Sequence, residues 1–187
     1  MIAELNEKLF WFINAPAGMA LDVVMIGFTV SGYAITTFLI GIAAMRFYKN
    51  LNGANAILLA AAIVVGGAVV HGIKQAVPQD RPLGYYAEHP PPAGKKVRAP
   101  FTQLRNRTFP SGHSQTSFGV AVLMALLFRR HVMLWFLWAS MVALSRVYLG
   151  LHFPIDIMAG SVIGASASVV TFEIGKRVYG IKNPRDA

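Results

Sequence analysis

The chain has 187 residues, of which 55% are hydrophobic and 13% are charged. Soluble globular domains carry roughly 25% charged residues, so the composition argues against a water-soluble protein. Seventeen basic and eight acidic residues give a net charge of +9, which in a polytopic chain indicates anionic lipid or topology signals rather than nucleic acid. Cysteine is absent, which excludes a disulfide framework, a thiol nucleophile and thiolate metal ligands.

The N-terminal segment 4–14 predicts an amphipathic helix that lies in the membrane interface and is too short to span it. Its apolar residues share one helical face, and its charged residues lie elsewhere (Leu5, Leu9, Phe12 and Ile13 against Glu4, Glu7 and Lys8). The two glutamates also argue against a cleavable signal peptide, which would carry positive charge there.

Five apolar runs follow, and we expect five transmembrane helices in a single domain that covers residues 1–187. The runs are Met19–Met45, Ala54–Ile73, Ser114–Phe128, Val132–Ser145 and Ile157–Phe172. About 20 apolar residues cross the hydrocarbon core, so we expect the last two helices to extend into flanking polar residues. Gly160 and Gly164 have GxxxG spacing, which favours close helix packing. The expected fold class is therefore all-α, a polytopic helical bundle with an interfacial first helix.

One long polar segment, residues 74–110, separates the second and third runs and predicts a structured loop with a short helix. With five crossings, this loop and the connection before residue 157 emerge on the same face. The opposite face carries eight basic residues, which the positive-inside rule would place in the cytoplasm (Arg46, Lys49, Arg129, Arg130, Lys176, Arg177, Lys182 and Arg185). The loop face carries nine basic residues. The positive-inside rule therefore decides the orientation in the membrane only if some of those nine residues serve the chemistry of a site.

Three short segments at these helix ends carry the chemically informative residues. They are Lys74 to Pro82 with Arg81, Pro110-Ser111-Gly112-His113, and Ser145-Arg146 followed by His152 and Asp156. A single Lys or Arg at a helix end is usually an anchor at the membrane surface. Three cations, two histidines and a carboxylate on one face instead predict a site for a phosphoryl group.

Two of these residues also have simple structural explanations. Ser111 precedes the third run and is a good N-cap, and a helix N-terminus with Gly112 beside it also favours a bound anion. Asp156 falls in the first turn of the fifth helix, and a role as a cap of that helix would by itself explain its presence. It could equally orient His152, because a carboxylate on one ring nitrogen leaves the other nitrogen free to attack.

The three segments resemble the tripartite signature of the type 2 phosphatidic acid phosphatase superfamily, KxxxxxxRP, PSGH and SRxxxxxHxxxD, over residues 74–156. This resemblance implies a phosphatase without metal or other cofactor, in which His152 attacks phosphorus and Asp156 orients the His152 side chain. It further implies that His113 protonates the leaving oxygen and then activates water. The remaining signature residues would bind the phosphoryl oxygens (Lys74, Arg81, Ser111, Gly112 and Arg146).

An active site at the membrane surface implies an amphiphilic lipid phosphate as substrate and the bilayer as the other partner, with no nucleic acid and no obligate protein partner. Among the candidate substrates we favour undecaprenyl diphosphate over phosphatidylglycerophosphate, phosphatidic acid and lipid A. The resemblance to bacterial members implies the inner membrane, with the site facing the periplasm or outside. A phosphotransferase and a non-catalytic lipid phosphate binder or transporter remain alternatives.

Overall fold

The computed structural model describes residues 1–181, which form eight helices and no β-strand within that range. The helices are α1 (Ile2–Ile13), α2 (Met19–Ser31), α3 (Ala34–Phe47), α4 (Gly53–Ala76), α5 (Pro82–Glu88), α6 (Gly112–Phe128), α7 (Val132–Tyr148) and α8 (Pro154–Tyr179). The predicted all-helical class is confirmed. Lys182 and Arg185, counted above as cytoplasmic charges, lie outside the described residues.

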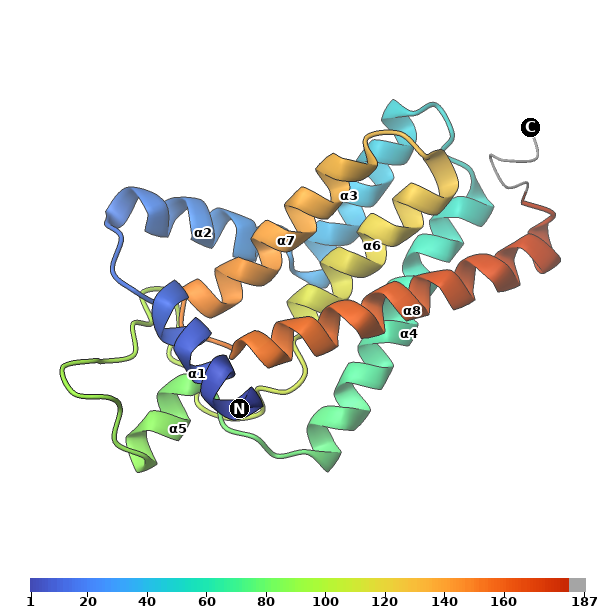
Figure 1. Cartoon of the computed structure of the whole chain (residues 1–187). Helices are drawn as coiled ribbons and strands as arrows, with labels where there is room; N and C mark the ends of the chain where they lie inside the picture. Colours follow the sequence, from blue (N-terminus) through green and yellow to red (C-terminus); the bar gives the residue numbers. More distant parts are fainter. Residues whose placement is uncertain (182–187) are drawn as a thin grey trace.

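Helix α6 is the centre of the bundle and contacts α3, α4, α7 and α8 (Figure 1). Most of its residues are buried, including Val120, Leu123 and Met124, which join a core with Leu59 of α4 and Phe172 of α8. Its first half also buries Ser114, Gln115, Thr116 and Ser117, and such polar side chains favour contact with other helices over contact with lipid. The central position of α6 therefore follows from its composition.

The GxxxG pair on α8 allows α8 to approach α6 closely, as predicted. A Cβ atom on Gly160 would lie 2.2 Å from the carbonyl oxygen of Ser111, and one on Gly164 would lie 2.0 Å from that of Gln115. Ser168, one turn further, donates a hydrogen bond of 2.6 Å to the carbonyl of Gly119. Because Gly160 lies near the start of α8, this packing also fixes the position of the α6 N-terminus.

The first apolar run is not one continuous helix, which corrects the predicted crossing 19–45. It breaks after Ser31, and α2 and α3 meet at an angle of 79°. Two hydroxyl groups satisfy the carbonyl groups freed at the break: Thr37 donates to Ser31 at 2.9 Å, and Thr116 of α6 donates to Gly32 at 2.8 Å. Tertiary contacts therefore stabilise a break that hydropathy alone does not reveal.

The number of membrane spans is not confirmed at five. By length and composition, α4 and α8 qualify as spans, and the bent α2–α3 pair raises the number to as many as three within the described residues. Helices α6 and α7 are apolar but have only 17 residues each. As predicted, α7 and α8 extend beyond their apolar runs, to Tyr148 and Tyr179 respectively.

Helix α1 is present as predicted, and the face that it turns to the protein differs from the apolar face expected to lie in the membrane interface. Phe10 and Trp11 are buried against Phe153 and Tyr86, whereas Leu5 and Phe12 remain 56% and 82% exposed. The side-chain oxygen of Asn6 accepts a hydrogen bond of 2.9 Å from the backbone N–H of Ile155. Helix α1 therefore caps the N-terminus of α8. Leu5, Leu9 and Phe12 of its predicted apolar face lie outside the fold, whereas Ile13 packs against the core.

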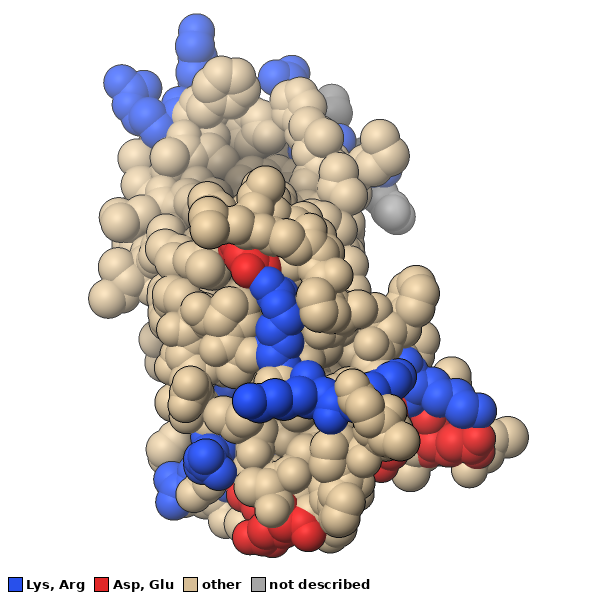
Figure 2. Space-filling view, turned by 90° about the vertical axis from the view of Figure 1, so that its left-hand side faces the viewer, with Lys and Arg blue, Asp and Glu red and all other residues tan. Residues whose placement is uncertain are grey.

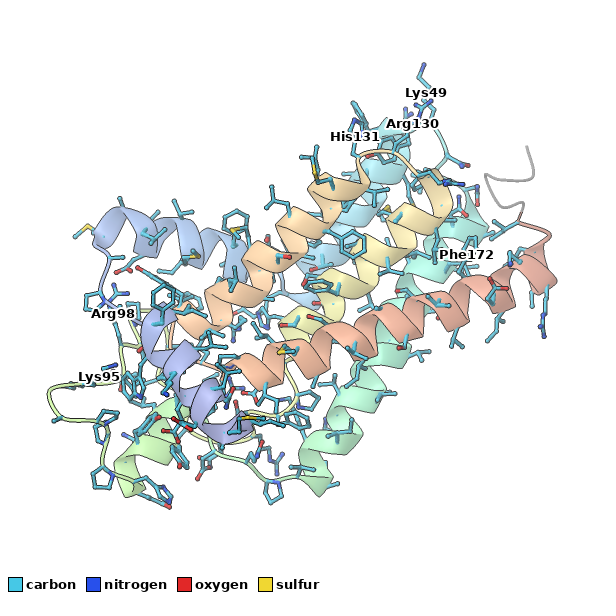
Figure 3. All side chains as sticks on the ribbon, viewed as in Figure 1. Lys49, Lys95, Arg98, Arg130, His131 and Phe172 are labelled. Atoms are coloured by element: carbon cyan, nitrogen blue, oxygen red, sulfur yellow. The ribbon has the colours of Figure 1, made fainter. Side chains whose placement is uncertain are left out.

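The connections between helices gather at two opposite ends of the molecule. The loop end consists of α1, α5 and residues 89–111 and 149–153, and the turn end consists of residues 48–52 and 129–131. Figure 3 places Lys95 and Arg98 at the first and Lys49, Arg130 and His131 at the second. The predicted short helix in segment 74–110 is confirmed as α5.

The loop at the loop end is fastened to the bundle. Arg98 forms an ion pair with Asp22 of α2, and the side chain of Asn14 donates to the backbone carbonyl of Arg98 at 2.8 Å. Val97 is buried in the same region. Figure 2 views this end and shows a band of Lys and Arg across it, with Asp and Glu near its lower edge. The loop of residues 89–111 is therefore an ordered surface segment whose charged residues are basic.

Candidate active site

The three signature segments converge at the loop end, as their order predicts. Lys74 lies in the last turn of α4, His113 in the first turn of α6, Arg146 in the last turn of α7, and Asp156 in the first turn of α8. His152 lies in the connection between α7 and α8. Figure 1 shows why these positions meet: the ends of these helices gather around the loop that carries α5.

His152 and Asp156 form a buried pair. Their side chains are 2% and 1% exposed, and His152 Nδ1 lies 3.2 Å from Asp156 Oδ2. The same carboxylate oxygen accepts a hydrogen bond of 2.8 Å from the backbone N–H of Phe153. Asp156 therefore serves both as a cap at the start of α8 and as the acceptor beside the imidazole, so the two interpretations of this residue are compatible.

The other ring nitrogen of His152 faces the cations. Nε2 lies 3.3 Å from Nη1 of Arg81. Burial lowers the pKa of His152 well below its usual value, and the positive charges of Arg81, Arg146 and Lys74 lower that pKa further. Protonation is thereby disfavoured, so the imidazole stays neutral and keeps a lone pair available on one nitrogen.

Neutral groups, not carboxylates, hold the three cations in place. Lys74 Nζ donates to the carbonyl oxygens of Arg107 at 2.7 Å and Thr108 at 3.1 Å, and Arg146 Nη1 donates to Thr29 Oγ1 at 3.4 Å. None of the three forms a salt bridge with a carboxylate within residues 1–181. With three cations and one nearby carboxylate, Asp156, the site keeps a net positive charge, which is what an anion-binding site requires.

Arg81 spans the gap between the α5 segment and the α7–α8 connection. Its guanidinium donates to the carbonyl oxygens of Asn106 at 3.0 Å and Leu151 at 2.9 Å, in addition to its contact with His152. Burial lowers the pKa of Arg81, and the nearby Asp156 opposes that shift. Because arginine begins with a pKa above 12, it remains a cation at neutral pH.

The start of α6 has the predicted anion-binding geometry. Ser111 is its N-cap, and Ser111 Oγ, which is fully buried, accepts from the backbone N–H of Ser114 at 3.4 Å. The ring of His113 packs edge-on against Tyr33 with centroids 4.7 Å apart. His113 Nε2 is buried and has no hydrogen-bond partner in the described part of the chain. That nitrogen is available to a bound ligand.

A pocket of about 410 Å³ lies where these groups meet. Six predicted residues line it, namely Lys74, Arg81, Gly112, His113, Arg146 and His152. Ser111 and Asp156 are not among its lining residues, since one caps α6 and the other lies behind the imidazole. Residues that the sequence analysis did not select complete the wall (Tyr33, Phe101, Thr102 and Leu104).

A second pocket of about 360 Å³ adjoins the first and shares Tyr33, Lys74, Gly112 and His113 with it. It extends away from the cations along α4 and α6, past small or apolar residues that include Ile63, Gly67 and Val70. The two pockets therefore pair a cationic chamber with a more apolar one.

A family model described as the PAP2 superfamily matches residues 55–179, and the chain belongs to this family of lipid phosphatases. The match covers the three motifs, all but the first two residues of α4, and α5 to α8. The resemblance suggested by the motifs is therefore confirmed at the level of the family.

The structure is similar to the crystal structure of Aquifex aeolicus LpxE, with a TM-score of 0.74 and 28% identity over 90% of this chain and 95% of that one. A curated relative, the putative undecaprenyl-diphosphatase YbjG of Escherichia coli, is 28% identical over 96% of this chain and 89% of its own length. A lipid A 4'-phosphatase of Bacteroides thetaiotaomicron is 47% identical over 58 residues, 30% of this chain. That match spans only 26% of the relative's length. Together these relatives indicate a bacterial membrane protein.

Proposed function

We propose that this protein is an integral membrane phosphatase that hydrolyses a phosphate monoester or diphosphate of an amphiphilic lipid through a phosphohistidine on His152. The observation that carries the proposal is the combination, in one pocket, of three cations without carboxylate partners and a neutral histidine backed by a buried carboxylate. A lipid phosphate binder would need the cations but not the His152–Asp156 pair.

In the first step, the lone pair of His152 Nε2 attacks the terminal phosphorus, and the bond from that phosphorus to the leaving oxygen breaks. The leaving oxygen is the lipid ester oxygen in a monoester and the bridging oxygen in a diphosphate. His113 gives a proton to the leaving oxygen, and the negative charge of the bound phosphoryl group favours the protonated form of His113. Lys74, Arg81 and Arg146 bind the phosphoryl oxygens with the Gly112 amide, and Ser111 holds the helix start that presents this amide. Such stabilisation of transition-state charge is usually the largest catalytic contribution.

In the second step, His113 takes a proton from water while the water oxygen attacks phosphorus. The P–N bond breaks, so inorganic phosphate leaves and His152 regains its lone pair. Because the three side-chain cations neutralise the phosphoryl charge, this mechanism requires no metal ion.

The paired pockets support a lipid as substrate. A headgroup bound among the cations would leave its hydrocarbon chain beside the second pocket, along α4 and α6. We place the protein in the bacterial inner membrane with five crossings, the bent α2–α3 pair being the first, and with the loop end facing the periplasm or outside.

We favour undecaprenyl diphosphate as the substrate, since the basic loop suits a multiply charged headgroup and one relative is named for that activity. Lipid A is the second candidate because another relative is named a lipid A phosphatase. Phosphatidylglycerophosphate and phosphatidic acid follow.

The test is a panel of these four lipids with the purified protein, assayed for released phosphate. We expect hydrolysis that persists in EDTA and is inhibited by vanadate, which mimics a five-coordinate phosphorus. Loss of activity in EDTA with recovery in magnesium would contradict the metal-free mechanism. Transfer of phosphate to an added lipid or sugar hydroxyl would identify a phosphotransferase, and binding without turnover would identify a carrier.

A further inference from the structure

Thr108 lies outside the three motifs, yet it contacts both members of the buried pair. Its side chain is 1% exposed. Thr108 Oγ1 donates a short hydrogen bond to Asp156 Oδ2 and lies 3.1 Å from His152 Nδ1. These distances make Thr108 a third member of the group that surrounds the imidazole.

The positions of the protons in this group follow from what each atom can donate. An ionised carboxylate only accepts, so the single hydroxyl proton of Thr108 is directed to Asp156. The oxygen of Thr108 then turns a lone pair toward His152 Nδ1, which must carry the ring proton. On the other side of the ring, the guanidinium of Arg81 only donates, so Nε2 must carry the lone pair.

The carboxylate of Asp156 depends on these contacts for its orientation. Oδ2 receives the hydroxyl of Thr108, the N–H of Phe153 and the imidazole, whereas Oδ1 has no hydrogen-bond partner within residues 1–181. The hydroxyl of Thr108 is the one side-chain donor besides His152 on this carboxylate in that range. Without it, the carboxylate loses a donor that holds Oδ2 toward the imidazole.

The backbone of Thr108 is anchored independently of its side chain. Its N–H donates to the carbonyl of Gln79 at 2.9 Å, and its carbonyl accepts from Lys74 Nζ at 3.1 Å. A change of side chain at this position therefore removes the hydroxyl while leaving these two backbone contacts available.

We propose that Thr108 is a positioning residue whose hydroxyl holds His152 in the tautomer with the proton on Nδ1 and aims its Nε2 at phosphorus. This inference rests on the proposed function, since it assigns the attack to His152. Thr108 acts through the imidazole and the carboxylate and does not itself line the phosphate pocket.

The test compares Thr108→Val, which keeps the shape but lacks the hydroxyl, with Thr108→Ser, which keeps the hydroxyl. Single-turnover formation of the phosphoenzyme is measured in both, and Thr108→Ala is included so that the result does not depend on how valine packs. Thr171→Val, a buried threonine on α8 outside the site, is the matched control.

We expect Thr108→Val and Thr108→Ala to slow phosphoenzyme formation about 10- to 100-fold, by analogy with the loss of an outer partner of a metal-ligating histidine. KM should stay near its wild-type value, and Thr108→Ser should recover most of the rate. In an Asp156→Asn background, Thr108→Val should cost less than it does alone, because both changes act on the same imidazole.

Wild-type rates in both Thr108→Val and Thr108→Ala would overturn the inference. Equal loss in the serine and valine variants would also overturn it, since the methyl group and not the hydroxyl would then matter. If the wild-type protein forms no phosphohistidine at all, the proposed function fails instead, so the two failures are distinguishable.

Discussion

The two nitrogens of His152 face opposite electrical surroundings, with Asp156 on one side and Arg81 on the other. Protonation of this imidazole removes the nucleophile. Because burial and the cations lower the pKa of His152, the acid limb of activity should lie below the usual histidine value of about 6.5.

Arg81→Gln should move this acid limb to higher pH. Removal of a positive charge beside the ring makes protonation easier, so the pKa of His152 rises and activity fails earlier as the pH falls. Lys74→Gln is the comparison and should shift the limb less, since Arg81 contributes more to the shift than Lys74. The measurement is kcat/KM against pH on one substrate, and an unmoved or downward shift in Arg81→Gln would contradict the assignment.

The two histidines should fail differently when replaced. His152→Ala should abolish turnover and the phosphoenzyme, because no atom remains to accept the phosphoryl group. His113→Ala should slow formation by about 10²–10⁴-fold, the usual value of acid–base catalysis, and p-nitrophenyl phosphate should restore much of that loss because its leaving group needs no proton. Acid-labile, base-stable phosphate on quenched enzyme decides the matter. If the phosphoenzyme persists in His152→Ala, the assignment of roles to His152 and His113 is wrong.

Most of this site is predictable from the sequence because its cations and histidines have fixed spacings at helix ends. Thr108 is not predictable in this way. A threonine three residues before Ser111 resembles any loop threonine until the fold brings it against Asp156 and His152. The burial of Ser111 behind the pocket also depends on how α6 packs, which no local pattern encodes.

At the scale of helices, the contact between α6 and α8 couples the site to the core. The backbone of Ser111 donates to the carbonyl of Asp156 at 3.0 Å, so the PSGH segment and the α8 start hold each other directly. The spacing of Gly160 and Gly164 predicted such a contact. The 79° break between α2 and α3 was not predictable, because residues 23–45 are uncharged throughout and the hydroxyl groups that stabilise the break come partly from α6.

Gly164→Ala should destabilise the protein. The added carbon would lie 2.0 Å from the carbonyl oxygen of Gln115 and 2.9 Å from the amide nitrogen of Gly119, and backbone atoms cannot move aside as a side chain can. Overpacking of this kind typically costs about 1–3 kcal/mol. Thermal unfolding in detergent measures the effect, with Gly72→Ala as the control because nothing lies within 4 Å of its Cβ position. Equal stability of the two variants would mean that α6 and α8 are not in close contact.

Gly67→Phe should distinguish the contribution of the lipid chain to binding from that of the headgroup. A side chain at this position would enter the second pocket, where the nearest atom to its Cβ position is Gln115 Oε1 at 4.0 Å. We expect kcat/KM for a long-chain lipid phosphate to fall about 10-fold or more, and that for a short water-soluble ester to fall less. Gly72→Phe, on the exposed side of α4, is the matched control. Equal losses on both substrates would argue against a lipid chain in this pocket.

At the scale of the whole molecule, all the proposed chemistry lies at the loop end, whereas the turn end carries contacts between connections. There, the hydroxyl of Tyr48 lies 3.0 Å from His131 Nδ1, which joins the connection between α3 and α4 to that between α6 and α7. His131 lies at the opposite end of the molecule from Lys95 and Arg98 of the loop end (Figure 3). The separation of the two ends makes the orientation in the membrane directly measurable.

Labelling of single cysteines measures this orientation. The chain has no cysteine, so Lys95→Cys and Arg130→Cys each introduce a single thiol, one at each end, at positions that are exposed. If the loop end faces outward, a membrane-impermeant maleimide should label the first variant in intact cells and the second only after the membrane is opened. The three basic residues Arg46, Arg129 and Arg130 would then lie inside, as the positive-inside rule favours. Labelling of Arg130→Cys alone in intact cells would reverse the orientation and place the substrate headgroup in the cytoplasmic leaflet, while both His152 and Asp156 would keep their proposed chemistry.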